Sequence, residues 1–244
     1  MALKDSLVSY WKLDEASGTR FDSHGSNDLT DNNTVGSATG KIGNCASFIA
    51  ANSEYLSHAD NADLSAGDID FTFGCWVYFD TIGTFPFIVN KGWGDGSGWI
   101  IYVRIDDSNK LWFSCNADAN TVKSAAVSTA TWYHVVVRHD SVNDLIKITL
   151  NGTTTSASYS GGVTDDAELF ILGGATFFLN GKIDEAFWAK RCWSDAEIDE
   201  IYNSGNGLSY DDWDAVVAGQ PTVKRWGGIE YSPFAVGMSG IKRW

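Results

Sequence analysis

Short runs of alternating apolar and polar residues, separated by turns rich in Gly, Asn and Asp, dominate this chain. In the run DFTFGCWVYF, residues 70–79, every second side chain from Phe71 to Phe79 is apolar. A repeat of two residues is that of a β-strand, whose side chains alternate between its two sides. Trp76 and Tyr78 stand at intervening positions, so we expect both sides of this strand to be covered. The run therefore predicts a strand within a sheet that is buried on both faces.

Two later segments predict β-hairpins. In one, residues 99–105 and 111–115 are strand-like and flank the polar turn DDSNK. In the other, residues 131–139 and 145–150 flank the turn DSVND, and an Asn-Gly turn follows. Turn residues that recur at this spacing are typical of an antiparallel β-sandwich. The predicted fold class is therefore all-β, an antiparallel β-sandwich of the jelly-roll type.

One segment predicts a helix: WSDAEIDEIYNSG, residues 193–205. Ser194 is suited to cap the first turn, and Glu197 three residues later completes a capping box. Ile198 begins an apolar stripe at helical spacing, and Gly205 marks the end. We therefore expect one short helix near the C-terminal end of the sandwich.

The chain carries 31 acidic and 17 basic residues, a formal net charge of −14. This charge argues against nucleic acid or anionic membrane as partners, because no basic surface attracts phosphate. The sequence contains no run of about 18 apolar residues that would span a bilayer. The start, MALKDSLVSYWKL, lacks an uninterrupted apolar stretch and a small-residue cleavage site, so we expect no secretory signal. We therefore expect a protein made in the cytoplasm without a signal peptide, which reaches the outside by lysis or by assembly into a particle.

The four cysteines, Cys45, Cys75, Cys115 and Cys192, are scattered and form no Cys-x-x-Cys motif. Zinc sites use such closely spaced pairs, and disulfides are typical of secreted chains. We therefore expect free cysteines that serve as small buried apolar residues.

Composition changes near Asp214. Residues 214–244 hold four basic and two acidic residues, a net charge of +2, whereas the rest of the chain carries −16. The tripeptide Lys-Arg-Trp occurs there twice, ending at Trp226 and at Trp244. We predict a sandwich domain over residues 1–213 and a C-terminal arm over residues 214–244.

Aromatic residues and arginines are enriched at the centres of protein interfaces. We expect the arm to dock on copies of this chain or on other particle subunits, through Trp226, Tyr231, Phe234, Arg243 and Trp244. The alternative is that the arm folds back onto its own domain as extra strands. Tails ending in Lys-Arg-Trp resemble those of phage structural proteins, which favours a virion or another extracellular particle as the location.

Four stretches, taken together and in order, resemble the laminin-G-like branch of the concanavalin A-like lectin/glucanase superfamily, whose jelly roll the pentraxins share. They are LVSYWKLDEASGTRFDSHGSNDLT, FTFGCWVYF, TWYHVVVRHD and NGKIDEAFWAKRCWSDAEI. The resemblance covers roughly residues 6–206 and implies a lectin-like sandwich. The chain departs from the family pattern where Phe187, Trp188 and Trp193 enlarge the aromatic area. These residues mark either a contact surface or a repacked core.

The Asp184-Glu185 pair in the last of these stretches allows three interpretations. The first is catalysis, because glycosidases place two carboxyl groups across the scissile bond. Neighbouring residues of a strand point to opposite faces, however, so we do not expect this pair to flank one bond. The resemblance implies a Glu-x-Asp-x-x-Glu motif in glucanases, and Tyr202 stands at its last position after Glu197 and Asp199. We therefore expect no enzyme, with a glycoside hydrolase of the same fold as a remaining alternative.

The second interpretation is a structural calcium ion, which binds carboxylates and loop carbonyls. The resemblance implies a site that joins Asp184 to the loop after the first strand, with Asp22 and Asn27 as further ligands. Such an ion would tie the N-terminal segment to a late strand. The third interpretation is that Asp184 and Glu185 accept hydrogen bonds from backbone amides where the strand leaves the sheet. In both of these cases the pair holds the structure together.

A glycine-rich loop, NKGWGDGSGW, carries the candidate ligand site. Trp93 can stack on a sugar ring, and Asp95 and Asn90 can hydrogen-bond its hydroxyl groups. The alternative is that Trp93 folds back over the edge of the sheet. Four other tryptophans fall in strand patterns and are expected in the core: Trp11, Trp76, Trp112 and Trp132.

These features together predict a non-catalytic binding or structural protein, a component of a virion or another extracellular particle. Its lectin-like domain is expected to contact surface carbohydrate or neighbouring subunits. The first alternative is a carbohydrate-binding module of a glycan-processing system. The second is the glycoside hydrolase considered above.

Overall fold

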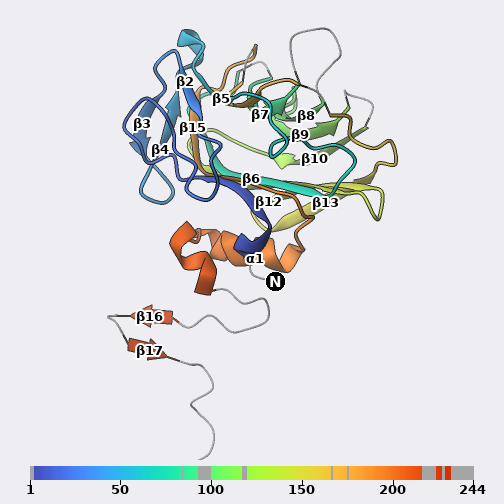
Figure 1. Ribbon diagram of the computed structural model, residues 1–244. Coiled ribbons are helices and arrows are strands. Elements are labelled where there is room, and N and C mark those ends of the chain that lie inside the picture. Colours follow the sequence, from blue (N-terminus) through green and yellow to red (C-terminus); the bar gives the residue numbers. More distant parts are fainter. Residues whose placement is uncertain are drawn as a thin grey trace, which may run out of the picture.

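The computed structural model describes residues 3–83, 85–92, 100–116, 120–165, 167–174, 176–215, 224–226 and 229–231. In these ranges two antiparallel sheets face one another and enclose the main apolar core (Figure 1). This arrangement confirms the predicted all-β sandwich. A short helix lies below the sheets in Figure 1 and packs against the outer side of one of them.

Eight strands form sheet I, whose longest strands are β6, β11 and β15, of nine residues each. In order across the sheet they are β13 (Thr153–Ser158), β12 (Leu145–Leu150), β11 (Trp132–Asp140), β6 (Phe71–Phe79), β15 (Gly181–Ala189), β4 (Asn44–Phe48) and β3 (Gly36–Thr39). The N-terminal strand β1 (Leu7–Trp11) pairs with β15 beside this path. The first strand of the chain is therefore held by the last strand of the sandwich.

Seven strands form sheet II, on the other side of the core. In order they are β10 (Asn120–Ala126), β9 (Lys110–Cys115), β8 (Ile101–Ile105), β7 (Phe87–Lys91), β14 (Phe170–Leu172), β5 (Tyr55–His58) and β2 (Thr30–Asn32). The hairpins predicted around the turns DDSNK and DSVND are present as β8–β9 and β11–β12.

Alternation along the strands decides which tryptophans enter the core between the sheets. Trp11 belongs to this core, as predicted. Trp76 is buried on the outer side of sheet I, where its ring stacks on Tyr202. The prediction was wrong for Trp112 and Trp132, which are only partly buried. Trp112 stands at an outward position between the core residues Leu111 and Phe113, and Trp132 stands outward beside Tyr133, which packs against the core.

A second apolar cluster lies between sheet I and the helix. In it the ring of Phe187 stacks on Trp193 at 4.8 Å between centroids, and Trp213 meets Phe187 edge-on at 5.4 Å. Phe187, Trp188 and Trp193 are each 1% exposed. The aromatic residues that depart from the family pattern are therefore a repacked core. All four cysteines are free, and three of them are buried.

The helix α1 (Asp195–Tyr202) begins at the predicted capping box. The Ser194 side chain accepts a hydrogen bond from the Glu197 amide, and the Glu197 carboxylate accepts one from the Ser194 amide. The helix ends at Tyr202, because Asn203 adopts a left-handed conformation with φ 49°. A 3₁₀ turn then continues to the predicted end. The 3₁₀ turns are η1 (Leu3–Ser6), η2 (Ala50–Asn52), η4 (Asn203–Gly205) and η5 (Tyr210–Ala215).

Within the predicted arm, β16 (Lys224–Trp226) and β17 (Ile229–Tyr231) pair with one another as a hairpin. Trp226 and Tyr231, two of the predicted interface residues, lie in these strands. The other three, Phe234, Arg243 and Trp244, lie outside the described residues. The domain boundary at residue 214 stays a prediction.

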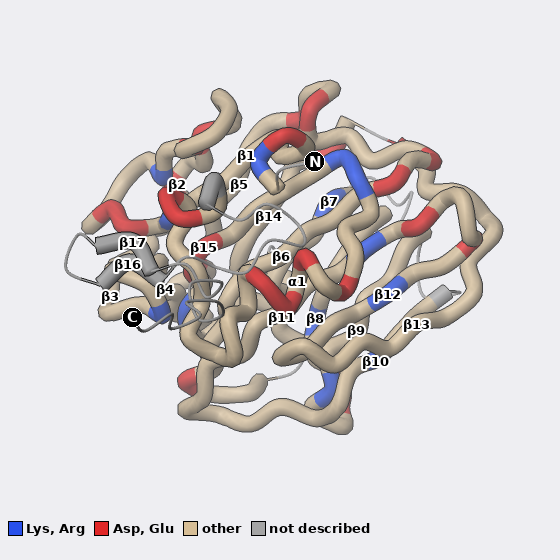
Figure 2. Tube along the Cα trace, turned by 90° about the horizontal axis from the view of Figure 1, so that it is seen from below, with Lys and Arg blue, Asp and Glu red and all other residues tan. Residues whose placement is uncertain are grey.

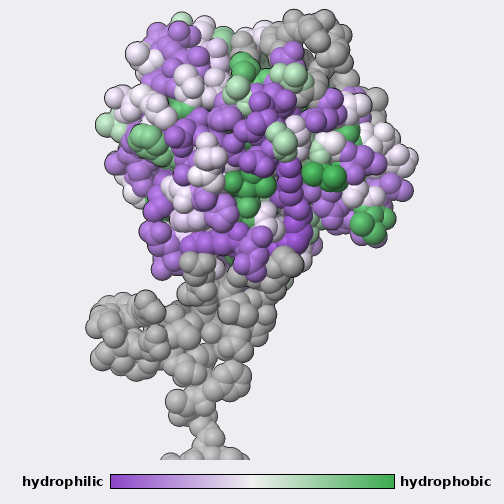
Figure 3. Space-filling view, viewed as in Figure 1, coloured by the Kyte–Doolittle hydropathy of each residue, from purple (hydrophilic) through white to green (hydrophobic). Residues whose placement is uncertain are grey.

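The surface of the sandwich is mainly polar and acidic. Figure 2 shows Asp and Glu spread over the loops around the body. Figure 3 shows a largely hydrophilic face with small, separate hydrophobic areas. The exposed large apolar side chains are Phe21, Ile49, Ile69, Val142 and Leu169. Isolated apolar residues of this kind are normal on a protein surface. No helix in the described ranges is long and apolar enough to cross a membrane.

Candidate functional site

A β-bulge in β15 sets the positions of Asp184 and Glu185. The register between β15 and β6 shifts between Asp184 and Phe187, which gives β15 one extra residue. Glu185 stands in the left-handed region with φ 50°. Ile183 and Ala186 both belong to the inner core, so Asp184 and Glu185 both lie on the outer side of sheet I. The expectation of opposite faces was wrong, because the bulge interrupts the alternation on which it depended.

Asp184 is fully buried and holds the loop that precedes β4. Its Oδ2 accepts hydrogen bonds from the amides of Lys41 (2.7 Å) and Ile42 (2.9 Å). Burial raises the pKa of Asp184 to about 7, although these two amides oppose the shift. Its Oδ1 is also buried and has no hydrogen-bond partner in the described part of the chain. The contacts of Asp184 are those of the third interpretation, in which backbone amides bind the carboxylate.

Glu185 joins β15 to the N-terminal strand. Its carboxylate accepts a hydrogen bond from the hydroxyl of Tyr10, which belongs to the second apolar cluster. Glu185 is 5% exposed, and burial raises its pKa to about 8. Asp184 and Glu185 are thus both enclosed and engaged with other segments of the chain. The opposite-face argument against catalysis is thus lost, and the absence of catalysis stays a prediction.

Asp22 organises its own loop. One oxygen, Oδ1, accepts hydrogen bonds from the amides of Tyr10 (3.0 Å), His24 (2.9 Å) and Gly25 (2.8 Å), and Oδ2 accepts one from Asn27 (3.0 Å). Backbone amides thus donate to both oxygens of the Asp22 carboxylate, which leaves few lone pairs for a metal ion.

Asn27 is likewise engaged, since its side chain donates to Ser9 Oγ (2.7 Å) and accepts from Asn61 (2.6 Å). Asp22 and Asn27 are therefore together, but the carboxylate of Asp184 is bound to a different loop. No group of three or more His, Cys, Asp or Glu side chains within the described ranges is placed to hold a metal ion. These donors do not fit one shared calcium ion, and that site stays a prediction that the contacts do not support.

Of the predicted ligand residues, Trp93 and Asp95 lie outside the described residues. Asn90 lies in β7 and faces the outer side of sheet II, since its neighbour Val89 faces the core. In the ladder Asn90 pairs with Tyr102, and Tyr102 pairs with Ser114. Arg104 and Trp112 form the next outward pair. We call these residues the aromatic face: Asn90, Tyr102, Arg104, Trp112 and Ser114.

The centre of the aromatic face is a guanidinium group enclosed by rings. The Arg104 Cζ lies 4.3 Å from the ring centroid of Trp112 and 5.4 Å from that of Tyr102. The ammonium group of Lys123 lies 4.4 Å from the Trp112 ring and is bound to Asp106 at 2.8 Å. Cations placed over aromatic rings are attracted by the ring quadrupole. The indole of Trp112 is thereby fixed between two cations.

On the aromatic face, Asn90 Oδ1 and Trp112 Nε1 are buried without a hydrogen-bond partner among the described residues. One is an acceptor and the other a donor. Because buried polar groups are normally satisfied, such a pair points to a bound molecule. Trp112 and Lys123 are partly exposed, so this edge of the face is open to solvent.

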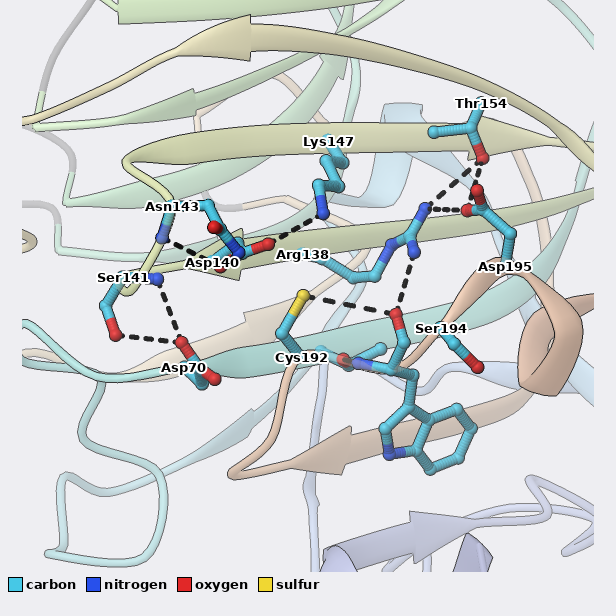
Figure 4. A network of polar contacts seen from close by, with 12 residues as sticks. Asp70, Arg138, Asp140, Ser141, Asn143, Lys147, Thr154, Cys192, Ser194 and Asp195 are labelled. Atoms are coloured by element: carbon cyan, nitrogen blue, oxygen red, sulfur yellow. Dashed lines mark hydrogen bonds and ion pairs between the residues drawn. The ribbon is translucent and has the colours of Figure 1, made fainter. Parts of the chain in front are cut away.

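A groove of about 520 Å³ opens on the outer side of sheet I, where α1 begins. Its floor includes Arg138, which is 1% exposed and donates to the carbonyl of Trp193 (2.7 Å) and to Asp195 (2.7 Å). Figure 4 shows Asp140, Asn143 and Lys147 on one side of Arg138 and Asp195 with Thr154 on the other. We call this the polar groove; besides these residues it is lined by Asp70, Val142, Arg191, Cys192, Trp193, Ser194 and Glu197.

The carboxylates of the polar groove are ionised partners of its basic groups. Burial alone would raise the pKa of Asp140, but hydrogen bonds from Lys147 and Asn143 outweigh it and lower the pKa. The pKa of Asp195 is lowered in the same way by Arg138. The groove is therefore polar and charged, and each of its cations is paired with a carboxylate.

The sequence contains signals for both surfaces that pattern reasoning did not use. Alternation in IYVRI places Tyr102 and Arg104 on one side of a strand, and in LWFSC it places Trp112 on the outer side. Alternation in VVVRHD and LIKITL likewise turns Arg138 and Lys147 outward. Charged or polar residues at every second position of apolar strands were the available clue.

A sequence model of the concanavalin A-like lectin/glucanase superfamily matches residues 50–199. Among the curated proteins no sequence matches. The match spans most of sheet II, the centre of sheet I and the first part of α1. It therefore includes the aromatic face and the polar groove.

Solved structures show the same fold at low sequence identity. The binding domain of Paraclostridial Mosquitocidal Protein 1 is 16% identical with a TM-score of 0.67, over 83% of this chain and 53% of that one. Domain 4 of AbnA, a GH43 extracellular arabinanase from Geobacillus stearothermophilus, in complex with arabinotriose, is 20% identical with a TM-score of 0.61, over 80% and 97%. Trypanosoma rangeli sialidase in complex with the inhibitor DANA is 14% identical with a TM-score of 0.64, over 83% and 34%. The chain thus spans about half of the toxin domain, about a third of the sialidase and nearly all of the arabinanase domain.

Proposed function

Because the chain belongs to the concanavalin A-like lectin/glucanase superfamily, we propose that it is a carbohydrate-binding protein that holds its ligand without cleaving it. The fold occurs both in a domain crystallised with arabinotriose and in a sialidase, so the fold alone does not separate binding from hydrolysis. The proposal is carried by the aromatic face, which unites a partly exposed indole with two unpartnered polar atoms.

The chemistry of the aromatic face suits a sugar. The C–H faces of a sugar ring pack against aromatic rings, and its hydroxyl groups both donate and accept hydrogen bonds. The exposed edge of the Trp112 indole offers an apolar contact, while Asn90 Oδ1 can accept from a hydroxyl and Trp112 Nε1 can donate to one. Arg104 holds Trp112 in place through the 4.3 Å contact. Trp93 and Asp95, which lie outside the described residues, remain proposed ligand residues.

Cleavage of a glycosidic bond needs two carboxyl groups on either side of it, roughly 5–10 Å apart. No residue of the aromatic face carries a carboxyl group, and Asp106 beside it is bound to Lys123. Asp184 and Glu185 are buried on the outer side of the other sheet. We therefore propose binding without turnover.

A glycan array followed by titration calorimetry tests this proposal. Trp112→Ala is expected to weaken binding of the sugar identified on the array at least tenfold. Loss of an aromatic anchor costs more than about 1.4 kcal/mol of binding free energy. Trp132→Ala is the matched control, because Trp132 is an equally half-buried outward tryptophan on sheet I. An array without any bound glycan, or equal loss in both variants, would show that the aromatic face does not bind sugar.

Assembly through the C-terminal arm is a second proposed role, supported by the opposite charges of arm and body, +2 and −16. In this role the arm docks on copies of the chain or on other subunits of a virion or extracellular particle. Replacing Trp226 and Trp244 by Ala in the full chain should lower the oligomer mass in light scattering. An unchanged mass would remove the arm from assembly.

A further inference from the structure

We propose that the polar groove is a second carbohydrate site, which takes a neutral, polyhydroxylated ligand such as a mono- or disaccharide. The choice of ligand class rests on the proposed function, whereas the location is independent of it. The polar groove opens on the outer side of sheet I, and the aromatic face lies on the outer side of sheet II. One chain would then bind sugar on both sides of the sandwich and bridge two glycans.

Each cation that lines the polar groove is paired with a carboxylate of the same lining. The pairs are Arg138–Asp195, Lys147–Asp140 and Arg191–Glu197, each with an N···O distance of 2.7 Å. Figure 4 shows the first two of them facing the same space. The charges cancel within these pairs, and Asp70, bound to Ser141, adds one carboxylate that no cation pairs with in the described ranges. The lining therefore disfavours an anion and favours a neutral molecule that forms hydrogen bonds.

The ion pairs leave both donors and acceptors for a ligand. Lys147 Nζ donates to Asp140 alone among the residues that the structure describes, and its side chain is 20% exposed, so N–H groups remain for a ligand. Asp70 and Asp195 each use Oδ1 for their hydrogen bonds, and in the same ranges none reaches the Oδ2 of either. A hydroxyl group donates and accepts at once, so several hydroxyl groups on one ring match this mixture.

The shape of the polar groove fits a small ligand bound by hydrogen bonds. Its volume of about 520 Å³ lies within the usual range of small-molecule sites. Trp193 lines it but is 1% exposed, so no ring is available for stacking. Val142, at the turn between β11 and β12, is 82% exposed and offers an apolar contact at the rim. We therefore expect weaker binding here than at the aromatic face.

Cys192 supplies a reporter inside the polar groove. It is the partly exposed member of the four cysteines, whereas Cys45, Cys75 and Cys115 are fully buried. The rate of its alkylation by N-ethylmaleimide is followed by mass spectrometry of the full-length protein. The probes are arabinotriose and a panel of other neutral mono-, di- and trisaccharides. At about ten times the dissociation constant, a bound sugar should slow alkylation of Cys192 about tenfold.

Four variants locate the effect. Lys147→Gln removes a donor of the polar groove and should reduce the protection, whereas Lys110→Gln, at an exposed position outside the lining, should not. Val142→Arg fills the rim at a position that is 82% exposed, so it should abolish protection without unfolding the chain. Trp112→Ala should leave the protection intact while the calorimetric stoichiometry falls from two sugars per chain to one.

The outcomes separate the two sites. Sugars that bind at the aromatic face but leave the Cys192 rate unchanged would overturn the second site and leave the proposed function standing. Protection that disappears in Trp112→Ala would also overturn it, because the effect would then originate at the first site. Protection without any Trp112-dependent binding would keep the second site and reject the first. Absence of both would reject the two together.

Discussion

The outer sides of the two sheets use aromatic residues in contrasting ways. On sheet I, Phe187, Trp193 and Trp213 pack against one another beneath α1 and η5 and are 1–2% exposed. On sheet II, Trp112 packs against Arg104 and Lys123 and stays partly exposed. The rings on sheet I are closed off by other rings and stabilise the fold, while the ring held by cations on sheet II keeps an exposed surface, which we propose as a ligand contact. The neighbours of a ring, more than its type, indicate its role.

The largest expected effect comes from Phe187→Ala, which opens a cavity in the second apolar cluster. We expect a loss of about 3–5 kcal/mol in the free energy of unfolding, because truncation of a buried Phe removes packing that the site does not recover. Trp112→Ala, on the other sheet, should lose about 1 kcal/mol or less. Urea unfolding measures both variants under the same conditions, and calorimetry measures their sugar affinity.

If the two outer sides differ as described, stability and sugar affinity should respond in opposite ways in these two variants. Phe187→Ala should keep its sugar affinity, and Trp112→Ala should keep its stability. If both variants lost the same amount of stability and affinity, the two outer sides would not differ in the way described here.

A smaller effect is the pH dependence of stability that comes from Asp184 and Glu185 on the outer side of sheet I. Burial raises the pKa of Glu185 to about 8 and that of Asp184 to about 7, so the folded state keeps protons that the unfolded state releases. Stability from these groups is therefore complete below their unfolded pKa values and is lost as pH rises toward 7 and 8. Burial lowers the pKa of His134 to about 3. This group therefore makes stability rise with pH, but only below pH 6.5.

Between pH 6.5 and 8 we therefore expect the free energy of unfolding to fall by on the order of 1 kcal/mol per pH unit. Glu185→Gln should flatten this slope, since glutamine does not titrate but can still bind Tyr10. Asp165→Asn, an exposed carboxylate, is the control and should leave the slope unchanged. Urea unfolding at several pH values within this window provides the measurement. A wild-type stability that is constant from pH 6.5 to 8 would contradict the buried, protonated state of the pair.

The smallest expected effect is that of calcium. Both oxygens of Asp22 accept hydrogen bonds from backbone amides, and Asp184 accepts them from the amides of Lys41 and Ile42. We therefore expect the same Tm with excess calcium and with a chelator. An ion bound to the folded state alone would add about 2.7 kcal/mol at a hundred times its dissociation constant. A calcium-dependent rise of Tm in thermal unfolding, lost in Asp22→Ala, would restore the calcium site implied by the family resemblance.

Much of the fold could be predicted because strand alternation and capping are local signals. The residues of DFTFGCWVYF specify β6, and Ser194 with Glu197 specifies the start of α1. The extra residue at Glu185 has no such signal: it is neither Gly nor Asn, and its left-handed conformation is maintained by tertiary contacts such as that with Tyr10.

The candidate sites were harder to predict, because they combine residues from separate strands. The role of Asn90 as a ligand residue stays a prediction, and the presence of Trp112 in a strand predicts a core position, although alternation in LWFSC turns it outward. The polar groove combines Arg138 of β11 with Asp195 of α1. That proximity follows from the docking of the helix on sheet I, which no local pattern encodes.

The pairing of β1 with β15 also governs how the chain acquires its structure. The hydroxyl of Tyr10 and the carboxylate of Glu185 are 175 residues apart in the sequence, yet they meet across neighbouring strands. During synthesis β1 therefore has no partner strand until nearly the whole sandwich has left the ribosome. Until then its apolar residues stay uncovered. Such distant contacts make folding slow, so a chaperone that shields the nascent N-terminal segment would raise the yield of native protein.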